Sequence, residues 1–196
     1  MTVWMRGRQV ALTYGAAVLL AALALQLLPL SRRTSFVLSV STDPDALLAH
    51  PVRSLLLSPF VLPDLRGLLL LPVAVATLIV LQRCFGARTA LVTAVLGHVL
   101  VSVGVAVLLE RDVGPPESLG RADVGVSYVL ATTAAASLAA GPRWFAWTAA
   151  VIGAAALAGL VAVGRGSTDA GHLTGWLLGV AVSWWLSRRA ARQLCD

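Results

Sequence analysis

Six long apolar windows constrain this chain more than any other feature. Each holds, or nearly holds, the about 17 to 25 predominantly apolar residues that a helix needs to cross a bilayer. Arg66 is the only formal charge inside them. The windows are residues 10–30, 65–82, 89–109, 124–140, 144–163 and 170–187. We therefore expect an all-α, polytopic membrane protein with a six-transmembrane-helix bundle, in which residues 1–196 form a single membrane domain.

The composition agrees with a chain that lies almost entirely in the membrane. Hydrophobic residues make up 58% of it and charged residues 12%, about half the share found in ordinary soluble domains. The first window is too long for the apolar core of a typical signal peptide. Its end, from Leu28 to Arg33, has no small-x-small cleavage site. We expect this window to be a retained helix.

The basic residues are all arginines, and they predict the orientation of the chain. Arg83, Arg88, Arg143, Arg188 and others fall in loops and tails on one side of the expected bundle. The acids other than Asp196 fall on the opposite side: Asp43, Asp45, Asp64, Glu110, Asp112, Glu117, Asp123 and Asp169. Because basic loops stay in the cytoplasm, we expect a cell-membrane protein with both termini cytoplasmic. The net charge of +6 then reflects orientation and lipid contact, and no nucleic-acid partner is expected.

The longest segment between windows, residues 31–64, lies on the outer side of the expected bundle. It contains a short, largely apolar run, residues 54–62. This run is too short to cross the membrane, but it is able to dip into the interface or re-enter the bilayer.

Two polar side chains at matched depth are the first candidates for chemistry. Ser127 is expected about one turn into the fourth helix, and His172 within the first turn of the sixth. Both helices start at the outer face, so a hydroxyl and an imidazole would meet there as a nucleophile and its base. A second interpretation needs no chemistry, since Ser127 could bond within its own helix and His172 could lie at the interface.

Short motifs surround both residues. Ser127 ends a Gly-x-Ser sequence, Gly125-Val126-Ser127, and His172 begins a His-x-x-Gly-x-x-x-Gly sequence preceded by Gly171. Further stretches at residues 51–60 and 84–88 flank the second window. Together these features resemble the rhomboid family of intramembrane serine proteases over most of the chain after residue 50. The resemblance implies a rhomboid-like bundle with Ser127 and His172 as a catalytic dyad.

Three glycines recur every four residues in the last window, at Gly171, Gly175 and Gly179. Small residues at this spacing let helix backbones approach closely in a membrane. The ridge is therefore expected to pack the sixth helix against the fourth and to bring His172 towards Ser127.

Other positions depart from the family pattern. The places of its oxyanion-binding histidine and asparagine fall on Arg66 and Leu70, and its second glycine is Tyr128. The aromatic residue that stacks on the histidine in the family would fall on Ala131. Losing one oxyanion donor costs roughly a hundred- to a thousandfold in rate. Arg66 is a candidate substitute donor, although we favour the simpler explanation that its side chain snorkels to the outer interface.

Two functions therefore remain open at this point. One is an intramembrane serine protease that cleaves transmembrane substrates. The other is a proteolytically inactive rhomboid-like protein that binds membrane helices. Neither needs a metal or an organic cofactor, and Cys84 and Cys195 lack metal-ligand spacing. His98, near the middle of the third window, receives no site role, and a hydrogen bond to a neighbouring helix, for instance through Thr132, would account for it. The all-arginine, Ala- and Val-rich usage suggests a bacterial source.

Overall fold

The structure is a computed structural model that describes residues 8–110, 124–164 and 167–193. Within these ranges the chain forms helices and no strands. Three acids used in the orientation prediction, Asp112, Glu117 and Asp123, lie outside the described residues. The all-helical fold class expected from the apolar windows is confirmed for the part of the chain that the structure describes.

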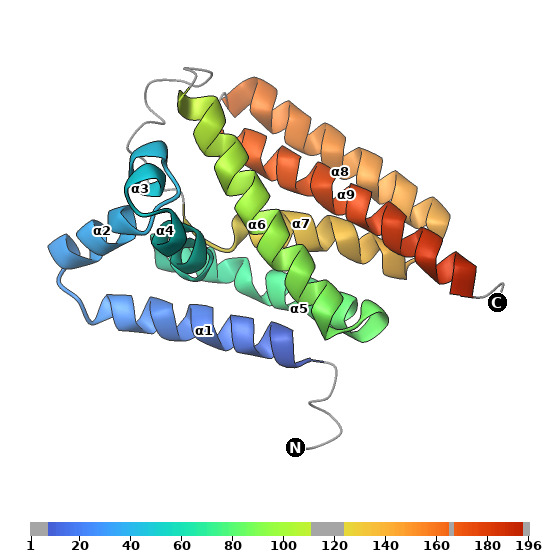
Figure 1. Ribbon diagram of the computed structural model, residues 1–196, viewed down its shortest axis with the longest axis horizontal. Coiled ribbons are helices and arrows are strands. Elements are labelled where there is room, and N and C mark those ends of the chain that lie inside the picture. Colours follow the sequence, from blue (N-terminus) through green and yellow to red (C-terminus); the bar gives the residue numbers. More distant parts are fainter. Residues whose placement is uncertain (1–7, 111–123, 165–166, 194–196) are drawn as a thin grey trace.

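Six helices form the body of the molecule, and short helices gather at one end of it (Figure 1). The body consists of α1 (Gln9–Gln26), α5 (Leu71–Phe85), α6 (Ala87–Glu110), α7 (Ser127–Ser137), α8 (Arg143–Gly164) and α9 (Ser167–Gln193). The shorter elements are α2 (Leu30–Ser39), α3 (Pro44–Ala49), α4 (Pro51–Leu57) and the 3-10 turns η2 (Ser58–Phe60), η3 (Leu65–Leu69) and η5 (Leu138–Ala140).

Proline and glycine explain where helix ends differ from the expected windows. α1 ends at Gln26 rather than residue 30, and Pro29 precedes α2, because proline has no N–H to continue the first helix. The fourth helix begins at Ser127 rather than residue 124. Gly125, just before it, has a φ of 121°, a conformation that side chains other than glycine's rarely adopt.

Four helical segments are long and apolar enough to cross a membrane: Gln9–Gln26, Leu65–Phe85, Ala87–Leu109 and Arg143–Val163. The chain is thus a helical membrane protein, but the expected count of six spans is supported for four of its helices. The apolar helix Ser127–Ala140 reaches only about 21 Å at 1.5 Å per residue, less than the roughly 30 Å of hydrocarbon. α9 is long, yet it carries histidine, threonine, serine and arginine side chains along its length.

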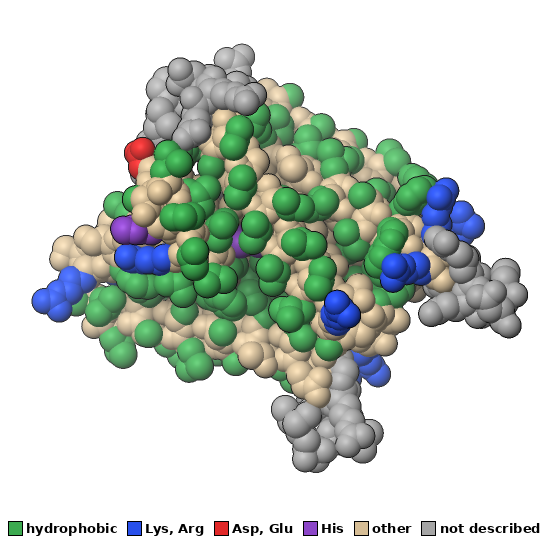
Figure 2. Space-filling view, viewed as in Figure 1, with side chains coloured by type: hydrophobic (Ala, Val, Ile, Leu, Met, Phe, Trp, Pro, Cys, Tyr) green, Lys and Arg blue, Asp and Glu red, His purple; other side chains and the backbone are tan. Residues whose placement is uncertain are grey.

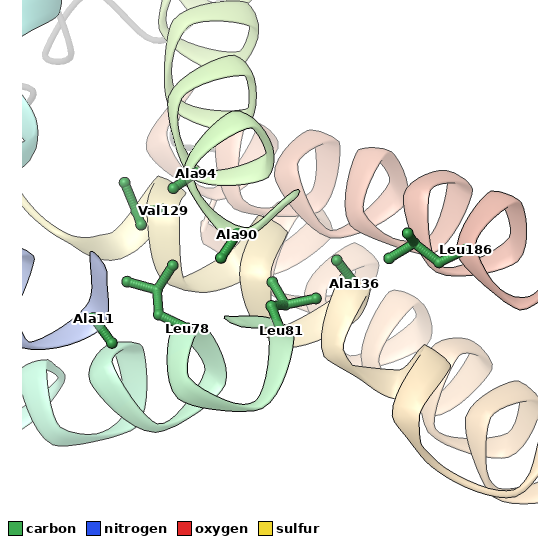
Figure 3. Packing of buried hydrophobic residues seen from close by; sticks show 8 residues of the cluster. All are labelled: Ala11, Leu78, Leu81, Ala90, Ala94, Val129, Ala136 and Leu186. Atoms are coloured by element: carbon green, nitrogen blue, oxygen red, sulfur yellow. The ribbon is translucent and has the colours of Figure 1, made fainter. Parts of the chain in front are cut away.

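α7 is the central helix of the bundle, and α5, α6 and α9 pack against it. Figure 3 shows the main core cluster, to which α1, α5, α6, α7 and α9 all contribute small or branched apolar side chains. Its buried members are Ala11, Leu78, Leu81, Ala90, Ala94, Val129, Ala136 and Leu186. This packing fixes the two ends of α7, including the end that carries Ser127.

Candidate functional site

The start of α7 is held against the segment that precedes α5. The backbone N–H of Gly125 donates to the carbonyl oxygen of Ser58 at 2.8 Å, and the positive φ of Gly125 turns the chain into the helix. Ser127 is the first residue of α7, with Val126 as its N-cap. The prediction that Ser127 lies one turn inside the helix was therefore wrong, because the turn at Gly125 places the start of α7 at Ser127.

His172 lies further into its helix than expected. α9 begins at Ser167, so His172 falls in the second turn rather than the first. Its side chain is half-buried, and its Nε2 atom is buried without a hydrogen-bond partner. Among the described residues, this leaves Ser127 and His172 without a hydrogen bond between them.

The imidazole of His172 contacts an aromatic ring from α7. Tyr128 meets it edge to face, with 5.5 Å between the ring centroids. The same tyrosine also lies near His98, at a centroid distance of 6.5 Å. Ala131 cannot supply the aromatic contact found in the family, and Tyr128 supplies one from a neighbouring position. Tyr128 is itself buried and contacts both histidines.

The three glycines of α9 face α7 in register. A Cβ on Gly171 would lie 2.6 Å from the ring of Tyr128, and one on Gly175 would lie 3.2 Å from Thr132 Oγ1. A Cβ on Gly179 would lie 2.3 Å from the carbonyl oxygen of Thr132. The absence of side chains along this face is what allows the two helices to touch.

Ser58 and His98 form a second serine–histidine pair. Ser58 Oγ and His98 Nε2 are 2.9 Å apart and both residues are buried. Ser58 comes from η2 and His98 from α6, so the bond ties the apolar run at residues 54–62 to a spanning helix. The partner suggested for His98, Thr132, was wrong, because Thr132 Oγ1 is buried without a partner.

Sequence reasoning missed Ser58 altogether. A signal was present, since a histidine inside a membrane helix needs a polar partner, and Ser58 stands in an apolar run that was expected to approach the membrane. What the sequence lacked was the fold of residues 31–64, which brings Ser58 to α6.

The two positions expected to bind the oxyanion, Arg66 and Leu70, lie in η3 and at its junction with α5. Arg66 is exposed in η3, where Asp64 accepts hydrogen bonds from its backbone N–H and from that of Gly67. Leu70 caps the start of α5. Among the described residues, no hydrogen bond or ion pair holds the Arg66 guanidinium, which suits a side chain that reaches the membrane interface. The described residues also contain no group of histidine, cysteine, aspartate or glutamate side chains able to hold a metal ion.

These features describe a helical membrane protein that carries a serine and a histidine on two neighbouring helices packed through glycines. The family model for rhomboid-like proteins matches residues 4–192 of the chain. The chain belongs to this rhomboid-like protein family. No curated protein and no solved structure matches it.

Proposed function

We propose that this rhomboid-like membrane protein binds transmembrane segments of other membrane proteins and does not cleave them efficiently. The observation that carries the proposal is the state of the two motif residues. His172 Nε2 is buried without a partner, and its ring packs against Tyr128 rather than sharing a hydrogen bond with Ser127. A serine hydroxyl needs a base within hydrogen-bond reach to become a nucleophile.

The surroundings of Ser127 support the same conclusion. The side chain of Leu70 offers no hydrogen-bond donor to a developing oxyanion, and its backbone N–H already donates to the Gly67 carbonyl oxygen. Arg66 is exposed on a short turn. The backbone N–H groups at the start of α7 would be the main donors to a tetrahedral intermediate. Removing one oxyanion donor costs about 3 to 4 kcal/mol of transition-state stabilisation in a serine protease. Turnover with so few donors should be slow or undetectable.

An apolar groove of about 500 Å³ supports the binding half of the proposal. It runs between α1, the α4–η2 segment and α6, where Leu91 and Val95 are half exposed. His98 lies in its lining, but its Nε2 is already bonded to Ser58. An exposed and largely apolar groove can receive the apolar side chains of another helix, and no Lys, Arg, Asp or Glu side chain lines it.

A defined crosslinking experiment tests this binding. A photoreactive residue is placed at Val95 in the groove, and a matched one at Ile152 on α8, which is also exposed. Adducts with transmembrane proteins should form at Val95 and fall when Leu91→Trp fills the groove. Equal adducts at both positions, unaffected by Leu91→Trp, would contradict the proposal.

The second candidate function is intramembrane proteolysis, and one observation favours it. His172 Nε2 is unpartnered, and its ring contacts Tyr128, the residue that follows Ser127. Catalytic hydrogen bonds that are long in the free enzyme often tighten when substrate binds. In that case Ser127 Oγ would attack the scissile carbonyl carbon while His172 takes its proton. The histidine would then protonate the leaving amine, and water would hydrolyse the acyl-enzyme.

We also propose that both termini face the cytoplasm. On the face shown in Figure 2, the end where α9 terminates carries basic side chains without acidic ones, whereas the opposite end carries both. Ends with an excess of arginine remain inside. A reporter fused to the C-terminus and active only in the cytoplasm should give signal. Activity of a reporter that works only outside would contradict this orientation.

A further inference from the structure

A groove between α6 and α9 is the most informative feature outside the serine–histidine region. Its volume is about 700 Å³, and Thr132 of α7 forms part of its lining. The walls are mainly apolar, with Leu96 and Leu100 from α6 and Leu178 from α9. The groove therefore lies on a face that would contact lipid in a membrane.

The charged residues of the groove all lie at one end. Arg88, at the start of α6, and Arg189, near the end of α9, both belong to its lining. The guanidinium of Arg189 stacks on Trp185, with 3.8 Å from its Cζ to the ring centroid. This contact fixes the cation above the groove and leaves its in-plane N–H groups available. Tryptophan at such a position is typical of the membrane interface.

Among the residues that the structure describes, no acid forms an ion pair with Arg88 or Arg189. Asp169 stands in the first turn of α9, about 30 Å along the helix from Arg189 at 1.5 Å per residue. Two guanidinium groups that have no described acidic partner and lie beside an apolar groove match a ligand with a negative head and a hydrocarbon tail.

The length of the groove distinguishes a lipid from a protein helix. From Arg88 to Leu100 it extends about 18 Å along α6, close to the roughly 15 Å of a single leaflet. A transmembrane helix would need a groove across both leaflets. Its cytoplasmic end would also carry positive charge, which Arg88 and Arg189 would repel.

We propose that the α6–α9 groove is a binding site for an anionic phospholipid. Its phosphate binds Arg88 and Arg189, and one acyl chain lies along Leu96, Leu100 and Leu178. This site is separate from the groove between α1 and α6 and does not depend on whether Ser127 is catalytic.

Native mass spectrometry of the full chain in detergent tests the proposal. The protein is offered equal amounts of phosphatidylglycerol and phosphatidylcholine with the same acyl chains. Wild type should retain phosphatidylglycerol preferentially. Arg88→Gln with Arg189→Gln should weaken that retention by roughly fivefold per arginine. Equal retention of the two lipids by wild type would overturn the proposal.

Two further variants separate the groove from general surface charge. Arg83→Gln with Arg143→Gln removes the same charge from exposed arginines outside this groove and should leave the preference nearly unchanged. Ala181→Trp, which fills the apolar part, should release the long-chain lipid although both arginines remain. An equal loss in the control pair, or full retention by Ala181→Trp, would overturn the groove as the site.

Discussion

The two serine–histidine pairs of this protein differ in everything except their residue types. Ser58 and His98 share a hydrogen bond of 2.9 Å in the buried interior. Ser127 and His172 are half-buried, carry the family motifs and share no such bond. The serine and histidine of the family motifs are therefore not the pair that is hydrogen-bonded in this structure. The hydrogen-bonded pair is Ser58 and His98, which attaches the segment around η2 to α6.

Tyr128 connects the two regions. Its ring lies near both His98 and His172, and it fills the space over Gly171. A glycine at this position, as in the family pattern, would leave that space open. We infer that the Tyr128 side chain occupies the space beside His172. This packing stabilises the contact between α7 and α9 and leaves less room for water at His172.

Substitutions in the contact between α7 and α9 should give the largest loss of stability. This contact positions the region of Ser127 and His172. Gly179→Leu forces a side chain against the backbone of Thr132 and Ala136, so it should cost about 3 kcal/mol or more. Gly175→Leu should cost less, because its nearest neighbours are 3.2 Å or more from a Cβ. Thermal unfolding in detergent measures both variants.

Ala181→Leu is the matched control for these variants. Ala181 lies on the same helix but borders the open groove beside α6, so the added side chain has room. If Gly179→Leu and Ala181→Leu unfold at the same temperature, the glycine face is not a close interface.

Removing the Ser58–His98 hydrogen bond should give the next largest loss of stability. Ser58→Ala leaves a buried imidazole nitrogen without its partner and should cost about 1 to 3 kcal/mol. A double-mutant cycle with His98→Phe should show coupling of about 0.5 to 3 kcal/mol. Thr174→Ala is the control, because this exposed hydroxyl bonds only within its own helix. No coupling in the cycle would mean that the pair does not fasten the loop.

The same substitution at the motif serine should have the smallest effect on stability. Ser127→Ala removes a hydroxyl that has no hydrogen bond to His172, so the change should stay within about 0.5 kcal/mol. The comparison with Ser58→Ala is direct, since the chemical change is identical. A loss at Ser127 as large as that at Ser58 would indicate a bond that forms between Ser127 and His172 in solution.

Local patterns predicted the helical fold, whereas tertiary contacts determined the polar pairs. Apolar windows and the motifs around Ser127 and His172 indicated a rhomboid-like membrane protein, and the family match confirmed it. The start of α7 was misplaced because it depends on the turn at Gly125, which is bonded to Ser58 far away in sequence. The partner of His98 was missed for the same reason, since only the folded segment of residues 31–64 brings Ser58 to it.

Labelling by a serine-reactive fluorophosphonate, in membranes that contain the full chain, tests the central claim most directly. If Ser127 is not activated, wild type should label slowly or not at all, with little signal above that of Ser127→Ala and His172→Ala. An active rhomboid protease in parallel membranes confirms that the probe works. Rapid labelling of wild type that both substitutions abolish would contradict the account and establish Ser127 and His172 as a working dyad.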